Sequence, residues 1–294
     1  MAATLAVKTR ISLNNILFAT DFSEVSRAAL HFATDLVRWY GGKLVVAHVV
    51  PPEPYLSVPL EPMPVDLDLF WNREKQRMAE FMAARSLEEI PHEEVLQRGE
   101  FWDVIADVIE NKKIDLVVAG THGRHGLKKV ILGSSAEKIY RQAKCPVLTV
   151  GPEVIRCGGT AWELKRILFA TDFSDTSLHA LPYALSLAEE NQATLIFVNV
   201  APLVPYQYKD SVAAGTEKQL AALMPPEPWC NPEFIVEFDF PAQGILKVAR
   251  EREADLIVLA VSGRAAARLT SHLPWSTASD VVSAASCPVL TVRG

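Results

Sequence analysis

Short, nearly continuous apolar runs alternate along the chain with stretches in which apolar residues recur at helical spacing. The runs Ile16–Ala19 and Ile167–Ala170 are typical of strands that are buried on both faces of a sheet. After the first run, apolar residues return every three to four positions as far as Tyr40, and Gly41-Gly42 then provides a helix stop signal. The pattern predicts a strand, a turn and a helix.

The same alternation continues through the rest of the sequence. Further strands are predicted at Leu44–Val50, Ile114–Ala119, Val147–Val150, Thr194–Val200, Asp255–Ala260 and Val289–Val292, and helices at Trp102–Lys112 and Gly244–Glu253. Strands that alternate with helices form right-handed βαβ units. We therefore expect an α/β fold, doubly wound, with parallel strands and helices on both faces of the sheet.

Two segments of the sequence occur twice, in the same order. The string ILFATDFS stands at Ile16–Ser23 and again at Ile167–Ser174, and CPVLTV stands at Cys145–Val150 and again at Cys287–Val292. Each repeat spans roughly 150 residues, which is enough for a domain with its own core. We predict two tandem domains, residues 1–151 and 166–294, joined by a linker at residues 152–165.

The region after the second predicted strand is rich in proline. Residues 51–71 carry prolines that exclude a regular helix or a central strand, so we expect a long surface excursion, a candidate lid. Phe70 and Trp71 at its end could contact a ligand or a partner, or could pack on the surface of their own domain.

Composition and charge exclude several classes of protein. Hydrophobic residues make up 49% of the 294 positions, and no stretch approaches the roughly 18 consecutive apolar residues of a membrane span. The N-terminal residues do not resemble a secretory signal, so we expect a cytoplasmic protein. A formal net charge of −6 gives no support for nucleic-acid binding.

The four cysteines show no metal-ligand spacing. Cys145 and Cys287 stand at equivalent positions of the two repeats, inside apolar runs. We expect buried free thiols rather than redox chemistry, and we predict no metal site.

Two predicted loops could form a ligand site. Ligands of doubly wound sheets bind beyond the carboxyl ends of strands, where the strand order reverses. Thr20-Asp21 follows the first strand, and the sequence GTHGRHGLKKVILGSS follows Ile114–Ala119. Its glycines allow close approach of the backbone to a phosphate, and Gly133-Ser134-Ser135 stands where the next helix begins. Arg124 and Lys128 could add positive charge.

Each of these residues also has a simpler structural explanation. Asp21 could cap the following helix, with Glu24 at the capping-box position, and the serines are good helix caps as well. The glycines could be ordinary turn residues. Solvated surface positions would explain the charged and imidazole side chains of the loop, namely His122, His125, Lys128 and Lys129. The combination of glycine spacing, helix start and acidic first loop favours a phosphate ligand.

At this point the residues resemble a known family. Gly120-x2-Gly123-x9-Gly133-Ser134 matches the ATP-binding motif of the universal stress protein family, and the tandem units resemble its domains over almost the whole chain. The resemblance implies a five-stranded parallel sheet of order 3-2-1-4-5 in each domain. It also implies pairing of the domains through Val147–Val150 and Val289–Val292, so that one chain is a pseudo-dimer, and assembly of chains into a homodimer.

The resemblance assigns roles to individual residues. It implies that Asp21, in the loop that begins with Thr20, meets the ribose and adenine side, and that the backbone of Val49 contacts adenine. The residues that it places around the phosphates are Gly120, Gly123, Arg124, Gly133, Ser134 and Ser135.

The second repeat departs from this motif. Asp172 and Gly263 remain, but Ala260 replaces Gly120, and Pro274-Trp275 occupies the place of Leu132-Gly133. If Gly120 has a positive φ, alanine there costs roughly 1 kcal/mol. The bulk of Trp275 would lie where the backbone should approach a phosphate, and Pro274 lacks an N–H donor. We predict one competent nucleotide site in each chain, in the first repeat.

These expectations favour a non-enzymatic, ATP-binding regulator of the stress response that acts on an unidentified protein partner. ADP or AMP would also fit, because the motif recognises phosphates chiefly through backbone groups. The sequence lacks the GxxxxGK[ST] loop and, in its first turn, the GxGxxG pattern, so we predict no catalytic residues. One alternative is a slow ATPase in which Asp21 and a metal such as Mg²⁺ assist hydrolysis. Another is a nucleotide-free interaction scaffold.

Overall fold

The computed structural model describes residues 11–52, 67–121, 133–157, 162–226, 228–261 and 274–294. Within these ranges the chain forms two compact units. One is built from residues 13–121 and 133–147, and the other from residues 11–12 and 148–294. The former holds the first sequence repeat apart from the end of its last strand, β5 (Val147–Val150), and the latter holds the second repeat together with residues 148–150.

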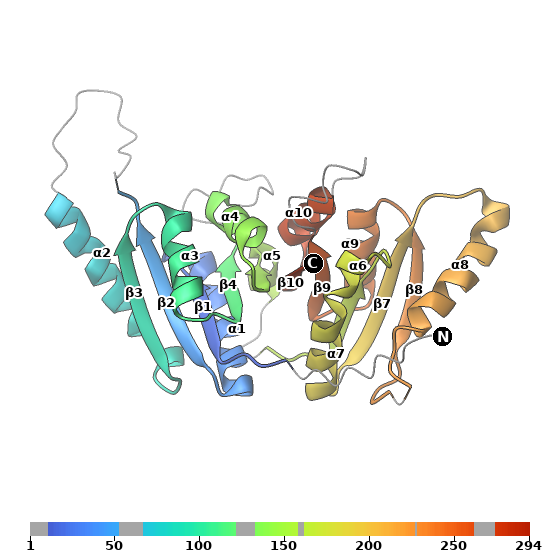
Figure 1. Cartoon of the computed structure of the whole chain (residues 1–294), viewed down its shortest axis with the longest axis horizontal. Helices are drawn as coiled ribbons and strands as arrows, with labels where there is room; N and C mark the ends of the chain where they lie inside the picture. Colours follow the sequence, from blue (N-terminus) through green and yellow to red (C-terminus); the bar gives the residue numbers. More distant parts are fainter. Residues whose placement is uncertain (1–10, 53–66, 122–132, 158–161, 227, 262–273) are drawn as a thin grey trace, which may run out of the picture. The chain divides into compact units, whose positions relative to one another are not determined.

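The first unit contains a parallel sheet of order β3-β2-β1-β4 (Figure 1). Its strands are β1 (Asn15–Ala19), β2 (Lys43–Val50), β3 (His92–Arg98) and β4 (Leu116–Gly120). The connecting helices are α1 (Glu24–Tyr40), α2 (Leu67–Met82), the 3-10 helix η1 (Arg85–Leu87), α3 (Phe101–Asn111) and α4 (Ser134–Gln142).

The second unit repeats this arrangement with the strand order β8-β7-β6-β9-β10, which is the expected order 3-2-1-4-5. Its strands are β6 (Arg166–Ala170), β7 (Thr194–Ala201), β8 (Glu233–Phe238), β9 (Leu256–Val261) and β10 (Val289–Arg293). Its helices are α6 (Asp175–Leu178), α7 (Leu181–Glu190), α8 (Tyr206–Ala221), α9 (Pro241–Glu251) and α10 (Pro274–Ala284). The predicted α/β fold with parallel strands and helices on both faces is confirmed.

The first strand of each repeat lies at the centre of its core. Ile16, Leu17 and Phe18 in β1 are 0% exposed, as are the corresponding residues Ile167–Phe169 in β6. Full burial on both faces explains why these strands are continuous apolar runs in the sequence. The edge strands β3 and β8 are only partly buried, and their mixed composition gave no such signal.

Helix α1 has the boundaries that its sequence predicts. Ser23 is the N-cap, and its hydroxyl oxygen accepts a hydrogen bond from the N–H of Ser26 at 3.2 Å. At the other end Gly41 adopts a left-handed conformation with φ of 66°, which glycine takes without steric cost.

One prediction about the connecting segments is wrong. Residues 67–71 belong to helix α2, although we expected no regular helix before residue 72. The last proline of the segment is Pro64, so none lies inside α2. The predicted linker contains a short helix, α5 (Pro152–Cys157), in which Val154 is buried. The rest of the proline-rich segment, residues 53–66, lies outside the described residues.

An aspartate at the start of the fourth strand ties it to the first strand in both repeats. Asp115 accepts hydrogen bonds from the N–H groups of Asn14 and Asn15 at 2.8 and 2.9 Å. Asp255 accepts equivalent bonds from Lys165 and Arg166, both at 2.8 Å. These bonds fix the register of the two central strands and hence the relative positions of the loops that follow them.

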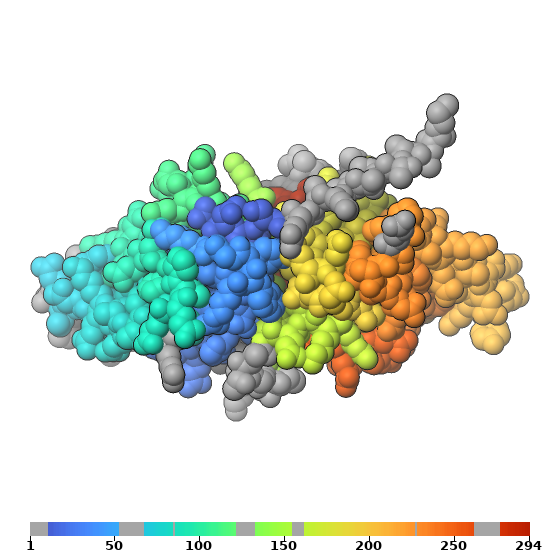
Figure 2. Space-filling view, turned by 90° about the horizontal axis from the view of Figure 1, so that it is seen from below, coloured from blue at the N-terminus to red at the C-terminus, as the bar shows by residue number. Residues whose placement is uncertain are grey.

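The second unit exposes aromatic side chains on one of its helices. Helix α8, drawn in light orange in Figure 2, exposes Tyr206 and Tyr208. In the parts of the chain that the structure describes, no helix is long and apolar enough to cross a membrane.

Candidate functional site

The loop after β1 lies where the strand order reverses. Strand β1 pairs with β2 through Ala19 and Ala47 on one side, and with β4 through Ala19 and Ala119 on the other. Chain connections therefore leave the sheet in opposite directions from this point. The loops that follow β1 and β4 start side by side, as the sequence predicted.

Hydrogen bonds hold the loop from Thr20 to Ser23 in a defined conformation. The N–H of Thr20 donates to the carbonyl oxygen of Ala47 at 2.9 Å. The Thr20 hydroxyl oxygen accepts bonds from the N–H of Phe22 at 3.0 Å and from the hydroxyl of Ser26 at 2.8 Å. Phe22 has φ of 64°, a conformation that is uncommon for a bulky residue and that these bonds support.

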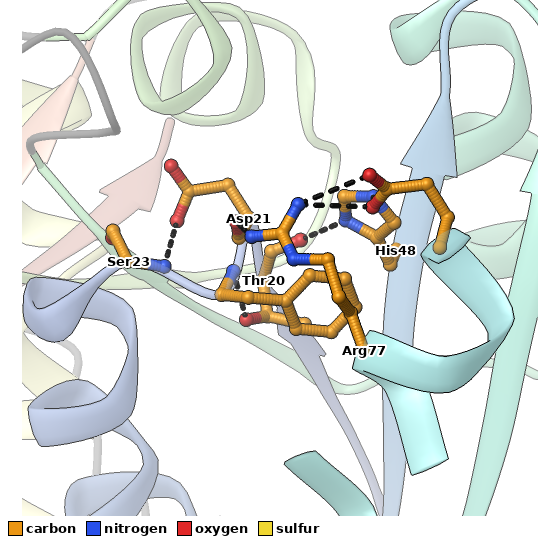
Figure 3. A network of polar contacts seen from close by, with 7 residues as sticks. Thr20, Asp21, Ser23, His48 and Arg77 are labelled. Carbon is orange, nitrogen blue, oxygen red and sulfur yellow. Dashed lines mark hydrogen bonds and ion pairs between the residues drawn. The ribbon is translucent and has the colours of Figure 1, made fainter. Parts of the chain in front are cut away.

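Asp21, the second residue of this loop, is half-buried. One carboxylate oxygen accepts a hydrogen bond from the N–H of Ser23 at 3.0 Å (Figure 3). The alternative that Asp21 caps α1 is wrong, because Ser23 is the N-cap. Asp21 instead closes a turn ahead of the helix, which presents its carboxylate beside the start of α1.

Gly120 is the last residue of β4 and lies against the start of α1. A Cβ atom on Gly120 would be 3.1 Å from Val25 Cγ1 and 3.6 Å from the backbone N of Ser26. Its φ is not positive, so the conformational cost that we assigned to an alanine at this position does not apply. The absence of a side chain at Gly120 allows the β1 and β4 loops to approach each other.

The two ends of the glycine loop are hydrogen-bonded to each other. The N–H of Gly133 donates to the carbonyl oxygen of Thr121 at 2.7 Å. Gly133 is also the N-cap of α4, and as a glycine it has no side chain that could cap the helix. Ser134 and Ser135 in the first turn are exposed. The first N–H groups of α4 and the positive end of its dipole can therefore interact with an anion.

The remaining predicted site residues fall into two groups, outside and inside the described part of the chain. Gly123 and Arg124 lie outside the described residues, as do His122, His125, Lys128 and Lys129. Val49 is half-buried near the end of β2, where it pairs in register with Gln97 of β3. Phe70 and Trp71 are half-buried in α2.

The sequence analysis missed a buried polar network beside the Asp21 loop. His48 of β2 is 7% exposed and Glu74 of α2 is 3% exposed. Arg77, from the following turn of α2, donates to both carboxylate oxygens of Glu74, and Figure 3 shows it beside His48. A histidine inside the apolar run KLVVAHVV was a signal that deserved weight, because a buried polar residue needs partners. Glu74 and Arg77 gave no signal, since helix α2 itself was not predicted.

The corresponding loop of the second repeat is similar, but its aspartate is bonded differently. Asp172 Oδ1 accepts bonds from both the N–H and the hydroxyl of Ser174, at 3.0 and 2.6 Å. Burial alone would raise the pKa of Asp172, but the bonds from Ser174 and Ser177 lower it overall. Its carboxylate is thus engaged by its own turn.

The second repeat also differs where the phosphate loop would end. Helix α10 begins at Pro274, so Trp275 belongs to its first turn, whereas the first repeat has Gly133 as a cap ahead of α4. Ala260 in β9 has no positive φ and replaces Gly120 without conformational strain.

Metal ligands and reactive thiols are two further kinds of candidate site. No group of three histidine, cysteine, aspartate or glutamate side chains suited to a metal occurs among the residues with described positions. Cys145 and Cys287 are free thiols; Cys287 is buried, as predicted, whereas Cys145 is half-buried. Burial raises the pKa of Cys145 to about 11 and that of Cys287 to about 12, so both stay protonated near neutral pH.

A family model described as "Universal stress protein family" matches residues 12–151 and 163–293 of the chain. The chain belongs to the universal stress protein family. Both repeats are matched, so the chain is a tandem member.

Individual relatives agree with this assignment. A universal stress protein of Methanocaldococcus jannaschii is 33% identical over 142 residues, which are 46% of this chain and 80% of that protein. One from Mycolicibacterium smegmatis is 25% identical over 295 residues, covering 95% of this chain and 96% of its own length. The crystal structure of a universal stress protein from Archaeoglobus fulgidus has a TM-score of 0.71 at 23% identity, over 96% of this chain and 99% of that one. This last similarity supports the fold of both repeats.

Proposed function

We propose that this universal stress protein binds one adenine nucleotide in its first repeat and acts as a non-enzymatic regulator in the stress response. The observation that carries the proposal is the meeting of three features at the switch point of the sheet. These are the Asp21 loop after β1, the close approach at Gly120 at the end of β4, and the start of α4 after its glycine cap Gly133.

The chemistry of these features suits the parts of a nucleotide. Backbone N–H groups at the start of α4, with the hydroxyls of Ser134 and Ser135, provide donors and a positive dipole for phosphate oxygens. Asp21 provides an acceptor for ribose hydroxyls, and the adjacent end of β2 at Val49 offers backbone groups to adenine. Gly123 and Arg124 complete the proposed phosphate-binding set. ATP, ADP and AMP share these groups, so all three are candidate ligands.

The proposal assigns no catalytic role. The sequence lacks the GxxxxGK[ST] loop and, in its first turn, the GxGxxG pattern, so we place regulation by nucleotide occupancy ahead of hydrolysis. Mg²⁺ would enter with the nucleotide phosphates. Steady-state release of inorganic phosphate by the wild-type chain, abolished by Ser134→Ala, would instead identify a slow ATPase.

We propose a single site in each chain, with the second repeat as its structural partner. One difference supports this proposal: α10 starts with Pro274-Trp275, whereas α4 of the first repeat starts after the glycine cap Gly133. A nucleotide phosphate would meet a tryptophan backbone position and a residue without an N–H group there.

We also propose that the last strands of the repeats pair within the chain and that chains form homodimers. The hydroxyl of Thr149 donates to the carbonyl oxygen of Val289 at 3.2 Å, which supports the first part. Light scattering coupled to size exclusion tests the second: a mass of twice 32.4 kDa supports a dimer, and a mass of 32.4 kDa excludes it.

The nucleotide content of the purified protein tests the proposed function. Nucleotide would be released by denaturation and identified by chromatography, for the wild type and for Gly133→Trp. We expect about one adenine nucleotide per wild-type chain and none in the variant. If neither protein carries nucleotide and titration with millimolar ATP gives no binding, the chain is an interaction scaffold.

A further inference from the structure

Both ring nitrogens of His48 face hydrogen-bond acceptors. His48 Nδ1 lies 2.7 Å from the carbonyl oxygen of Thr20, and Nε2 lies 3.2 Å from Glu74 Oε2 (Figure 3). The histidine and the glutamate are both almost completely buried. Water therefore cannot replace a hydrogen-bond partner that either side chain loses.

These distances require a proton between His48 and Glu74. A carbonyl oxygen can only accept, so Nδ1 carries a hydrogen and donates to Thr20. A neutral imidazole with hydrogen on Nδ1 would turn its Nε2 lone pair toward an ionised carboxylate. A second ring hydrogen, on Nε2, removes that repulsion by donating to Glu74 Oε2. Loss of this proton costs one of the two hydrogen bonds of the ring.

Arg77 extends the network to the Asp21 loop. Its Nη1 lies 3.1 Å from each carboxylate oxygen of Glu74, and its Nη2 lies 3.5 Å from the carbonyl oxygen of Asp21. The guanidinium also lies over the ring of Phe22, 4.9 Å from its centroid, and that ring lies 4.2 Å from the ring of His48. Helix α2 is thereby connected to the strained turn next to the proposed ligand.

Strand β3 and helix α1 also pack against β2. From β3 the residue in register with His48 is Leu96, and from α1 Arg27 lies over the ring of Phe81 at 5.2 Å. Among the described charged groups, Glu74 contacts the histidine directly and Arg77 contacts it through Glu74, whereas the Asp21 carboxylate points away from it toward Ser23 (Figure 3). The positive charge of Arg77 disfavours a positive charge on the His48 ring, whereas the carboxylate of Glu74 favours it.

The second repeat shows what the same position does without a titrating group. Asn199 stands in β7 where His48 stands in β2, and its Nδ2 donates to the carbonyl oxygen of Thr171 at 2.8 Å. Thr171 is the counterpart of Thr20. An asparagine therefore suffices to hold the loop to the second strand, and the added contact to an acidic residue belongs to the repeat with the proposed nucleotide site.

We infer that His48, Glu74 and Arg77 are positioning residues that hold the Asp21 loop in the conformation that binds the adenine nucleotide. The proton shared by His48 and Glu74 keeps helix α2 in contact with this loop. The inference rests on the proposed function and makes nucleotide affinity dependent on pH: affinity is highest where the proton is bound and falls as rising pH removes it.

The full chain provides the test. ATP affinity would be measured by titration calorimetry between pH 6 and pH 9 for the wild type, His48→Asn and Glu74→Gln. His48→Asn keeps the bond to Thr20, as Asn199 does in the second repeat, and Glu74→Gln keeps a donor toward Nε2 without a shared proton. We expect the wild-type affinity to fall about tenfold over this range relative to both variants, the equivalent of one hydrogen bond to a charged group.

A control and a second readout separate this role from a merely structural one. His31→Asn changes an exposed histidine of α1 and should leave the wild-type pH profile unchanged. Nitrogen-15 spectra of the histidine rings, with the His48 signals assigned by their absence in His48→Asn, should show hydrogen on both ring nitrogens at neutral pH.

The outcomes separate this inference from the proposed function. Equal pH profiles in the wild type and His48→Asn, or a His48 ring without hydrogen on Nδ1, would overturn the positioning role while nucleotide binding stands. A wild-type chain that binds no ATP at any pH would overturn the proposed function and the positioning role together.

Discussion

The main-chain N–H of Gly133 donates a hydrogen bond to the carbonyl oxygen of Thr121, 2.7 Å away. This bond joins the start of α4 to the end of β4, so the helix begins next to the loop that follows β1. The same bond closes the glycine loop at its base, next to the end of the strand that pairs with β1. Four predictions follow from this arrangement and its surroundings.

Asp21→Asn should weaken adenine nucleotide binding by about tenfold or more, the range for a lost hydrogen bond to a charged group. The fold should be retained, because the asparagine oxygen can still accept the bond from the N–H of Ser23. Affinity measured by calorimetry and unfolding in urea would check both parts. Asp172→Asn is the matched control in the second repeat and should leave affinity unchanged. Equal losses in both variants would contradict a single site in the first repeat.

Ser134→Asp should change stability and binding in opposite directions. A carboxylate in the first turn of α4 interacts favourably with the helix dipole and should stabilise the fold by about 0.3–1 kcal/mol. The same charge should repel the nucleotide phosphates and reduce affinity at least tenfold. Thermal unfolding and calorimetry measure the two effects, with Ser134→Ala as the uncharged reference. Unchanged affinity in Ser134→Asp would show that phosphate does not bind at this helix end.

Gly120→Val should destabilise the first repeat by about 1–3 kcal/mol, because added methyl groups overpack the contact with Val25 of α1. Gly120→Ala should cost less, since its single methyl group requires Val25 to shift by only a few tenths of an ångström. Ala260 occupies the equivalent position in the second repeat. Free energies of unfolding from urea titrations would test the order. A larger cost for alanine than for valine would contradict close approach as the role of this glycine.

The thiols of Cys145 and Cys287 should react slowly in the native protein. Burial disfavours the thiolate and raises the pKa of the two groups to about 11 and about 12. The folded state therefore holds these protons more tightly than the unfolded state, and the stabilisation they provide is present below about pH 8.5 and is lost as pH rises toward 11 and 12. Alkylation at pH 8, followed by peptide mass spectrometry, should modify both residues only after denaturation. Rapid native labelling of Cys287 would contradict its burial.

The parts of the fold that the sequence predicted are those with strong, local signals. Continuous apolar runs identified the buried central strands, and the glycine after Tyr40 identified the end of α1. The strands β3 and β8 were missed because edge strands with mixed exposure carry neither a continuous nor an alternating pattern. Helix α2 was missed because prolines that precede it were taken to describe the whole segment.

The sequence predicted the loops of the candidate site but not the buried network beside them. The loops of Asp21 and Gly133 were found because their residue types combine glycine, serine and acid at strand and helix ends. The network joins His48 to Glu74 and Arg77, which lie 26 and 29 positions further along the chain. The packing of the two elements against each other cannot be read from the sequence. Only the three-dimensional arrangement brings the carboxylate of Glu74 within 3.2 Å of the imidazole of His48.

The most direct test of the account is the stoichiometry of nucleotide binding to the full chain, measured by equilibrium titration with ATP. The account predicts one equivalent per wild-type chain, and none in Gly133→Trp. Two equivalents of similar affinity would contradict the single site, because the second repeat would then bind nucleotide in spite of Trp275.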